Sequence, residues 1–159
     1  MAKKCIVASC IIIKEGKTLL LMHRKLGKWL YPGGHIDENE VPTQAAVREA
    51  KEETGFKVRL ISKSILKLRK KHSTEKPAPL CTLYENVYYK TGRHTHFDLI
   101  YLAEPVGRQG RLAKGESEQL RWVSIKEIDG LDTYENVKET LKYALNAANT
   151  QNKPKTYLH

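Results

Sequence analysis

A single stretch of 24 residues, 33–56, restricts the fold and the chemistry of this chain more than any other part of the sequence. It reads GGHIDENEVPTQAAVREAKEETGF and holds six of the 18 acidic residues. The chain as a whole is basic, with 28 Lys and Arg residues and a net charge of +10. Because like charges at helical neighbour spacing repel one another, something must offset this local concentration of carboxylates.

The second half of this stretch has the pattern of a helix over residues 42–54. The proline at its start suits the first helical position, and Gly55 suits the end. At about 100° per residue, Glu49, Glu52 and Glu53 fall within an arc of about 100° on one face. Three carboxylates within one turn repel one another unless a cation lies among them. The helix therefore predicts a cation site.

Oxygen donors of this kind favour a hard divalent cation, Mg²⁺ first and Mn²⁺ second. Protein-bound Mg²⁺ usually has a few carboxylate ligands together with water and substrate phosphates, so the pattern indicates a site for a phosphorylated substrate and its attacking water. Arg48 can pair with a neighbouring carboxylate and hold it in position. Gly33 and Gly34 let the backbone approach an ion or a phosphate closely, and a carbonyl there can complete the coordination shell.

The rest of the chain indicates one α+β domain. A length of 159 residues suits a single domain with a substantial core. Several strand-like segments and two helical patterns predict an α+β sandwich with a mixed sheet, with the domain over residues 1–147 and a polar, flexible tail over 148–159. The expected strands are 4–13, 18–25, 57–66, 80–89, 96–106 and 118–125, the expected helices are 42–54 and 133–148, and residues 26–34 are an expected loop.

Two sets of side chains are expected in the core. One is an apolar stripe on the second helix, and the other consists of aromatic residues within the expected strands, which pack in a core more often than they face solvent. These strand aromatics are also candidates for stacking on a nucleobase, the less favoured interpretation. The members of the stripe are Val137, Leu141, Tyr143 and Leu145, and the strand aromatics are Tyr84, Tyr88, Tyr89 and Phe97.

The three cysteines, Cys5, Cys10 and Cys81, form no CxxC pair, and the first two point to opposite faces of one expected strand. We therefore expect small, reduced, buried side chains rather than a disulfide or a metal site. The N-terminal apolar run is short and is followed by a charged turn, which favours a first strand over a signal peptide. No apolar run approaches the ~20 residues of a membrane helix, so the sequence predicts a cytoplasmic protein without a membrane partner.

The spacing within residues 33–56 resembles the signature of the Nudix family, in its MutT-like form. The matching residues follow the family's order without gap or mismatch: Gly34, Glu40, Arg48, Glu49, Ala50, Glu52, Glu53, Gly55 and Phe56. A solvated surface helix with ordinary acids leaves these offsets unexplained. The resemblance implies an α/β/α sandwich with a mixed β-sheet between helices. It also implies hydrolysis of a diphosphate linkage in a nucleoside diphosphate derivative.

The resemblance implies a role for each matching residue. Glu49, Glu52 and Glu53 would ligate Mg²⁺ with help from the Gly34 carbonyl, and Arg48 would orient the carboxylates. Glu40 and Gly55 would support the structure of the loop and helix. A further acid from a later loop often completes such a site, and this chain offers Glu116 and Glu118, of which we favour Glu118 as a catalytic residue.

One position departs from the family pattern. Many Nudix sequences have Ser or Thr just before the helix proline, whereas this chain has Val41, whose side chain cannot accept a backbone N–H. We expect Thr43 or Glu40 to compensate, or the helix start to fray at a cost of about 1 kcal/mol.

The loop that enters the signature supplies candidates for substrate binding. Trp29 and Tyr31 offer flat aromatic faces that suit a nucleobase, while Arg24 and Lys28 can reach the outer phosphates. His96 can donate a hydrogen bond to a phosphate.

The sequence RHTHFD places His94, His96 and Asp98 at period two, so one face of a strand can carry all three. A transition-metal site is the less favoured interpretation, because the run has no evident fourth ligand and enters an apolar strand. A structural role or a wall of the substrate site is favoured instead.

These observations favour a Mg²⁺-dependent pyrophosphohydrolase acting on a small nucleotide. Two alternatives remain open, a nucleotide-sensing or RNA-binding protein with the Nudix fold, and an RNA 5′-end pyrophosphohydrolase. The net charge and the basic run at residues 67–72, KLRKKH, keep RNA as a second candidate partner, although a solvated basic loop is the favoured interpretation of that run. The resemblance also makes a homodimer a candidate assembly.

Overall fold

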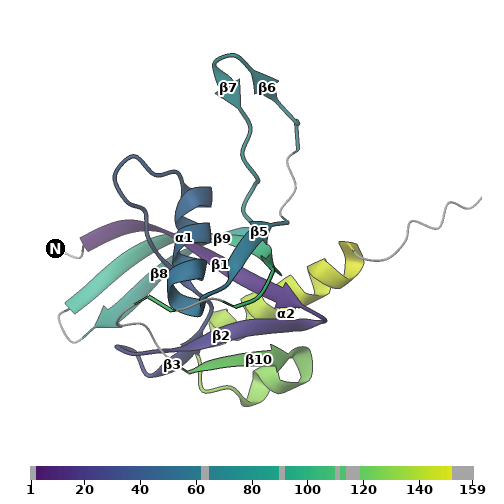
Figure 1. Cartoon of the computed structure of the whole chain (residues 1–159). Coiled ribbons are helices and arrows are strands. Elements are labelled where there is room, and N and C mark those ends of the chain that lie inside the picture. The colour runs from purple at the N-terminus through teal and green to yellow at the C-terminus, as the bar shows by residue number, and fades with distance from the viewer. Residues whose placement is uncertain (1–2, 62–64, 90–91, 110–111, 114–118, 152–159) are drawn as a thin grey trace, which may run out of the picture.

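The structure, a computed structural model, describes residues 3–61, 65–89, 92–109, 112–113 and 119–151 (Figure 1). A mixed sheet carries one long helix on each side, as the sequence predicts. The strands are β1 (Lys3–Lys14), β2 (Lys17–His23), β3 (Lys28–Leu30), β4 (Gly33–His35), β5 (Lys57–Leu60), β6 (Arg69–Lys70), β7 (Ser73–Thr74), β8 (Cys81–Tyr89), β9 (Gly92–Val106) and β10 (Leu120–Ser124). The helices are α1 (Pro42–Thr54), a 3₁₀ helix η1 (Ile125–Gly130) and α2 (Glu135–Gln151).

The main sheet runs in the order β10-β2-β1-β9-β5, with β3 paired to β2, β4 to β1 and β8 to β9. The central pair, β1 and β9, is parallel from Lys3↔His94 to Ile12↔Ala103, and the other pairings are antiparallel. The sheet is therefore mixed. A parallel pair needs a long crossover, and here the chain between β1 and β9 supplies β2, the signature and α1.

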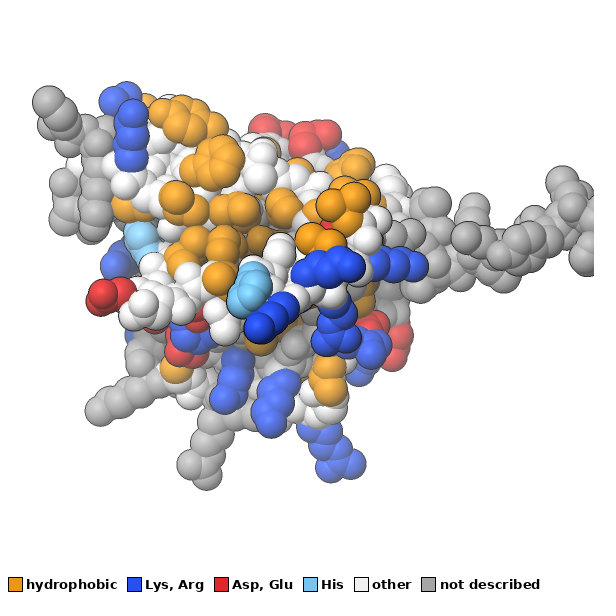
Figure 2. Space-filling model, turned by 90° about the horizontal axis from the view of Figure 1, so that it is seen from above, with side chains coloured by type: hydrophobic (Ala, Val, Ile, Leu, Met, Phe, Trp, Pro, Cys, Tyr) orange, Lys and Arg blue, Asp and Glu red, His pale blue; other side chains and the backbone are white. Residues whose placement is uncertain are grey.

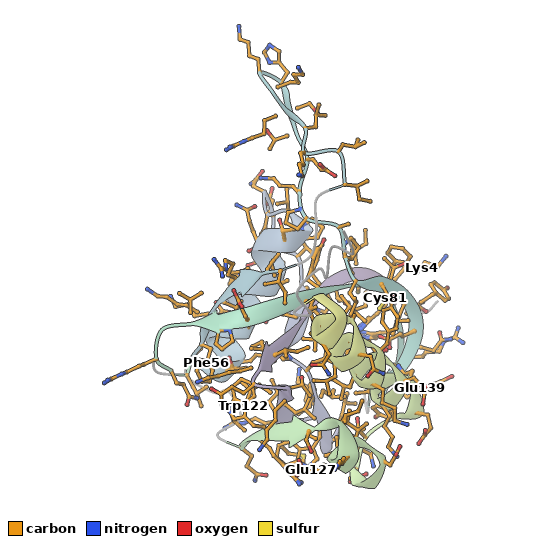
Figure 3. The ribbon with its side chains drawn as sticks, turned by 90° about the vertical axis from the view of Figure 1, so that its right-hand side faces the viewer. Lys4, Phe56, Cys81, Trp122, Glu127 and Glu139 are labelled. Atoms are coloured by element: carbon orange, nitrogen blue, oxygen red, sulfur yellow. The ribbon has the colours of Figure 1, made fainter. Side chains whose placement is uncertain are left out.

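The two faces of the sheet are covered by different kinds of side chain. On the α1 side the buried residues are mostly small, among them Ala8, Ala45, Ala46 and Ala50. Small residues let the helix lie close to the strands, and an edge-to-face pair of Phe56 and Trp122 closes the end of this layer (Figure 3).

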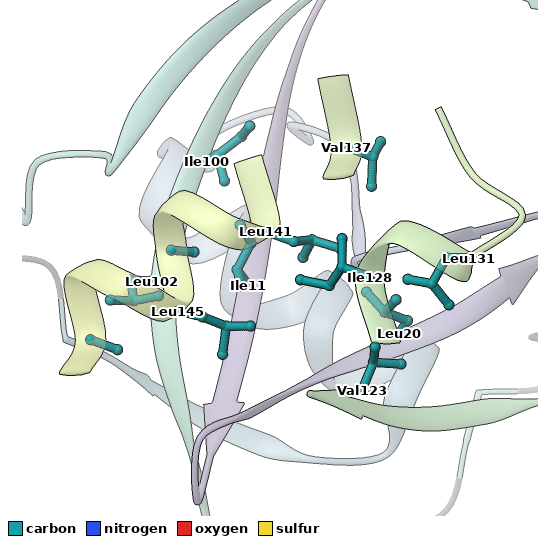
Figure 4. Close-up of a cluster of buried hydrophobic side chains, with 12 residues drawn as sticks. Ile11, Leu20, Ile100, Leu102, Val123, Ile128, Leu131, Val137, Leu141 and Leu145 are labelled. Carbon is teal, nitrogen blue, oxygen red and sulfur yellow. The ribbon is translucent and has the colours of Figure 1, made fainter. Parts of the chain in front are cut away.

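The α2 side of the sheet has a core of larger aliphatic residues. Ile11, Ile100 and Leu102 from the central strands pack against Leu141 and Leu145 of α2 (Figure 4). This apolar layer fixes α2 across the sheet, because burying such side chains contributes about 1.5–3 kcal/mol each. The members of the predicted helix stripe lie here, except Tyr143, which is exposed. Ala144 and Ala148 are buried on that face instead.

Several expected boundaries differ from the structure. The expected loop at 26–34 contains the short strands β3 and β4, and the expected strand at 57–66 ends at Leu60. Helix α2 continues to Gln151, so residues 148–151 of the expected flexible tail are helical, and Ala148 packs against the core. The remaining tail residues lie outside the described residues. The basic run, expected as a loop, takes part in a small β6–β7 hairpin that projects from the body (Figure 1).

The prediction that the strand aromatics pack in the core is wrong for three of them. Tyr84, Tyr88 and Phe97 are 68%, 70% and 45% exposed, so they are not core residues. Each is on the face of β8 or β9 that α2 does not cover, and α1 covers only the other end of that face. The side chain of Tyr89 lies outside the described residues.

The cysteines are free thiols, as expected. Cys10 is buried, and burial raises the pKa of its thiol to about 12, whereas Cys5 and Cys81 are partly buried. Over the part of the chain that the structure describes, no helix has the length and apolarity that crossing a membrane requires.

Candidate active site

Helix α1 starts and ends where the sequence predicts. Gly55 adopts the left-handed conformation, with φ of 74°, and its N–H donates to Lys51 O at 2.9 Å. At the start, Val41 provides no side-chain cap, but Gln44 Oε1 accepts the Val41 N–H at 3.0 Å. The compensation therefore comes from Gln44, not from Thr43 or Glu40, and the helix start is only partly capped.

The buried alanines of α1 fix the direction of its acidic face. Because Ala46 and Ala50 pack on the sheet, the side chains of Glu49 and Glu53 turn toward β4. Glu49 has only 16% of its side chain exposed, while Glu52 has 44%. The acidic face therefore lies against protein on one side and faces solvent on the other.

The two glycines of β4 meet this acidic face directly. Glu53 Oε2 accepts the Gly33 N–H at 2.9 Å. Gly34 lies so close to Glu49 that a Cβ at residue 34 would be 2.5 Å from Glu49 Oε1. Residue 34 must therefore lack a side chain if Glu49 is to keep its position.

Arg48 connects the acidic residues to one another. Its guanidinium donates to Glu40 through Nε at 3.0 Å and Nη2 at 2.9 Å, and Nη2 also donates to His35 O at 2.9 Å. The third nitrogen, Nη1, donates to Glu49 Oε1 at 2.7 Å and to Glu52 Oε2 at 3.1 Å. A planar fork of five donors is suited to this task, and a lysine ammonium could not reproduce it.

These contacts change the acidity of the groups in the network. The hydrogen bond from Arg48 holds the pKa of the Glu40 carboxyl below its ordinary value, and Glu40 in turn raises the pKa of Arg48. Both groups are therefore charged throughout the physiological range, as their predicted supporting roles require.

The donor set suits a hard divalent cation. Three carboxylates and a nearby backbone carbonyl are the oxygen ligands that Mg²⁺ and Mn²⁺ take. As the side chains stand, however, the described residues contain no group of three His, Cys, Asp or Glu arranged around a metal position. Arg48 Nη1 lies between Glu49 and Glu52, and Glu53 is bonded to Gly33. A cation at this site would have to replace some of these contacts.

Three of the predicted substrate residues lie in the turn after β2 and in β3. Arg24 is exposed in the turn after β2, whereas Lys28 is paired with Asp132. The backbone of Trp29 is bonded to the same segment: its N–H donates to Asp132 O, and its carbonyl accepts from Thr133 Oγ1 at 2.6 Å. Trp29 also packs against the core on the α2 side.

Tyr31 and His96 lie on the α2 side of the sheet, not beside α1. Tyr31 packs against that core, and burial is the main cause that raises the pKa of its hydroxyl well above the ordinary value. His96 is buried and its ring contacts His35 edge-to-face at 5.8 Å between centroids. Glu116 and Glu118 lie outside the described residues, so the predicted role of Glu118 stays a prediction.

Asp98, which the sequence offered as a structural residue or part of the wall of the substrate site, lies in a buried polar cluster whose other members were not predicted. Asp98 Oδ2 accepts from Ser9 Oγ at 2.8 Å, while Asp98 Oδ1 has no hydrogen-bond partner although the residue is only 3% exposed. Burial raises the Asp98 pKa to about 7. Glu85, on β8, bonds Asn136 near the start of α2, and burial raises its pKa as well.

Backbone atoms of Gly33 join the acidic face of α1 to this cluster. Its N–H is bonded to Glu53, and a Cβ at residue 33 would lie 2.7 Å from Ser9 Cβ. Ser9 in turn donates to Asp98. The carboxylates of α1 and the buried polar cluster are thus adjacent, on the two sides of one strand.

A family model for the NUDIX domain matches residues 3–144 of the sequence. This chain belongs to the Nudix family. The match covers all the residues of the predicted signature and both sides of the sheet, so the resemblance first noted on residues 34–56 extends over nearly the whole domain.

Solved Nudix structures share the fold. A Nudix family hydrolase from Clostridium perfringens aligns with a TM-score of 0.79 and 30% identity, over 90% of this chain and 97% of that one. The predicted mixed sheet between helices is therefore confirmed for this Nudix protein.

Two curated Nudix-type relatives carry functional names. A Bacillus subtilis protein named "Putative 8-oxo-dGTP diphosphatase" is 39% identical over 118 residues, which is 74% of this chain and 64% of that protein. A Lactococcus lactis protein named "Probable DHNTP pyrophosphohydrolase" is 29% identical over 107 residues, 67% of this chain and 58% of that protein. The chain thus spans about three-fifths of the length of each relative.

Proposed function

We propose that this Nudix protein is a Mg²⁺-dependent pyrophosphohydrolase of nucleoside triphosphates and related compounds. The observation that supports the proposal is the meeting of the α1 carboxylates with the glycine backbone of β4. Glu53 accepts the Gly33 N–H, Gly34 leaves room for Glu49, and Arg48 donates to both Glu49 and Glu52. The residues that would hold the ion are Glu49, Glu52, Glu53 and the Gly34 carbonyl, and Mn²⁺ is expected to substitute for Mg²⁺.

The proposed reaction is attack by water on a phosphorus of the substrate's anhydride. The bond from that phosphorus to the bridging oxygen breaks, so a triphosphate gives a nucleoside monophosphate and pyrophosphate. When bound, Mg²⁺ supplies positive charge that offsets the charge building on the phosphate oxygens. The chain's own part is to position these groups: Arg48 orients two carboxylates and is itself held by Glu40.

We further propose that the substrate's ring carries a 2-amino group beside a ring N–H and a carbonyl. Guanine and pterin rings share this edge, and the names of the two relatives refer to one compound of each kind. A carboxylate is a suitable acceptor for two adjacent N–H donors. Asp98 has an oxygen without a partner, next to Ser9 and within one strand of the α1 carboxylates.

The RNA 5′-end alternative uses the same chemistry on a larger substrate, and the sensing alternative uses no turnover. A panel assay separates them: dGTP, 8-oxo-dGTP, dihydroneopterin triphosphate, dATP, ADP-ribose and 5′-triphosphorylated RNA, each with Mg²⁺. We expect the three substrates with the shared edge to be cleaved best. If the protein cleaves none of the six compounds, the proposed hydrolase activity is refuted. A cytoplasmic location and a homodimer stay predictions.

The metal assignment has its own test. Glu53→Gln should lower turnover by orders of magnitude and weaken Mn²⁺ binding measured by calorimetry, while far-UV circular dichroism stays unchanged. Glu38→Gln is the matched control, because Glu38 is an exposed acid in the loop before α1. Near-normal turnover in Glu53→Gln would show that this carboxylate is no metal ligand.

A further inference from the structure

One face of the sheet carries large side chains that neither helix covers. On the α1 side, β1, β9 and β8 continue beyond the buried alanine layer, and their outward residues there are exposed. Tyr84 and Tyr88 on β8 are 68% and 70% exposed, Ile6 on β1 is 57% and Phe97 on β9 is 45%. Large apolar side chains that are exposed together in one patch mark an interaction site more often than scattered ones do, so this face is a candidate binding surface.

The strand register makes these side chains neighbours. Phe97 is directly opposite Tyr84 in the antiparallel pair and directly beside Ile6 in the parallel pair. The three therefore form one row across adjacent strands that lie about 4.8 Å apart. Tyr88, four residues along β8, faces the same side opposite Arg93, and we call Ile6, Tyr84, Tyr88 and Phe97 the aromatic face.

The charge around the aromatic face is positive. Lys4 precedes Ile6 on the same side of β1, and Arg93 is opposite Tyr88, both exposed. Among the described residues, no Asp or Glu points from this side of the three strands. Seen from above, the molecule shows a broad area of hydrophobic side chains with Lys and Arg along its edges and acids at the periphery (Figure 2).

Exposed aromatic rings on a sheet with basic borders suit unpaired nucleobases, because any base can stack on a ring while its phosphates meet the cations. We propose that the aromatic face binds single-stranded RNA. The polar side chains of Asn86 and Thr82 lie on the same side of β8 and can bond ribose hydroxyls, which DNA lacks at the 2′ position. This activity goes beyond the proposed hydrolysis and does not require it.

The same observations argue against a second copy of the chain as the occupant. An isologous contact through this face would bury the Lys4 and Arg93 of both protomers in one interface, with no acid on the described part of the face to pair with them. RNA phosphates instead complement that charge. The net charge of +10 further favours an anionic polymer.

The test measures binding of a 12-nucleotide, 3′-labelled RNA by fluorescence anisotropy at about 50 and about 200 mM salt. The RNA carries a 5′-hydroxyl, so it has no anhydride that the proposed active site could cleave. We expect the wild-type chain to bind single strands more tightly than a duplex of equal length. Tyr84→Ala and Phe97→Ala should each weaken binding by about tenfold or more, whereas Tyr84→Phe should keep it.

The matched control is Tyr143→Ala, because Tyr143 is 59% exposed but lies on α2. Its RNA affinity should equal that of the wild type, and nucleotide hydrolysis should be unchanged in all four variants. Equal affinity of Tyr84→Ala and wild type, equal binding of duplex and single strand, or no RNA binding at the lower salt would each overturn the proposal. So would a wild-type dimer in analytical ultracentrifugation that Phe97→Ala converts to a monomer.

Discussion

Replacing Asp98 with asparagine should make the stability of the protein less dependent on pH. Asp98 is 3% exposed, and burial raises its pKa from 3.8 to about 7. The native state therefore holds this proton between those two pH values, while the unfolded state has released it. Because the unfolded state then binds fewer protons, the free energy of unfolding falls as pH rises from about 4 to about 7.

The size of the effect follows from the shift. Three pKa units at about 1.4 kcal/mol each give about 4 kcal/mol as an upper estimate of the stability lost between pH 4 and pH 8 through this one group. The asparagine side chain cannot ionise, so the variant lacks this loss. Any fixed cost of the new amide beside Ser9 shifts the whole curve but leaves its slope alone.

The assay is urea unfolding at pH 5, 6, 7 and 8, followed by the fluorescence of the two tryptophans. The difference in unfolding free energy, variant minus wild type, should grow by at least about 1 kcal/mol between pH 5 and pH 8. Glu104→Gln, at a partly exposed carboxyl on the same strand, controls for general charge effects. A difference that stays flat with pH would refute the argument that Asp98 is buried at a desolvation cost.

Four further substitutions test β4, α1 and the residue that precedes α1. Gly34→Ala should keep the fold but lower activity at least tenfold, because the new Cβ meets only the movable end of the Glu49 side chain. Gly33→Ala should instead lower the unfolding free energy measured in urea titrations by about 1–3 kcal/mol, because its Cβ meets the backbone of Ser9. Arg48→Lys should lower kcat/KM at least tenfold without changing the helix content, because a lysine cannot make all the contacts of the guanidinium. Val41→Ser should raise the unfolding free energy by about 1 kcal/mol, with unchanged activity, by adding the missing cap.

The acidic helix could be predicted from sequence because its signals are local. The proline, Gly55 and the helical spacing of three glutamates all depend on residues within a few turns, and the structure places the helix bounds as predicted. The contact of Glu53 with Gly33 is also foreseeable in kind, since glycines mark close backbone approach.

The cluster around Asp98 could not be predicted in the same way. Ser9 and Asp98 are 89 positions apart and meet only because β1 and β9 pair in parallel, a register that no local pattern sets. The prediction that the strand aromatics are core residues was wrong for a related reason. Alternation shows that Tyr84 and Tyr88 share a face, but which face a helix covers, and how far along the strands, depends on the placement of α1.

The position of β4 explains why the two glycines of the signature have different tasks. Gly34 faces α1, where the absence of a side chain leaves room for Glu49, and Gly33 faces Ser9 on the other side of the sheet. Successive residues of a strand point to opposite faces, so a pair of adjacent glycines is the shortest sequence that opens both sides at one point. The carboxylates that would hold the ion and the buried acid that would bind the ring can therefore lie back to back across one strand. Among the described residues β4 pairs with β1 alone, and side chains of α1 bond its backbone: Glu53 accepts the Gly33 N–H and Arg48 donates to His35 O. The short strand thereby ties the acidic helix to the sheet at the point where the two glycines open it.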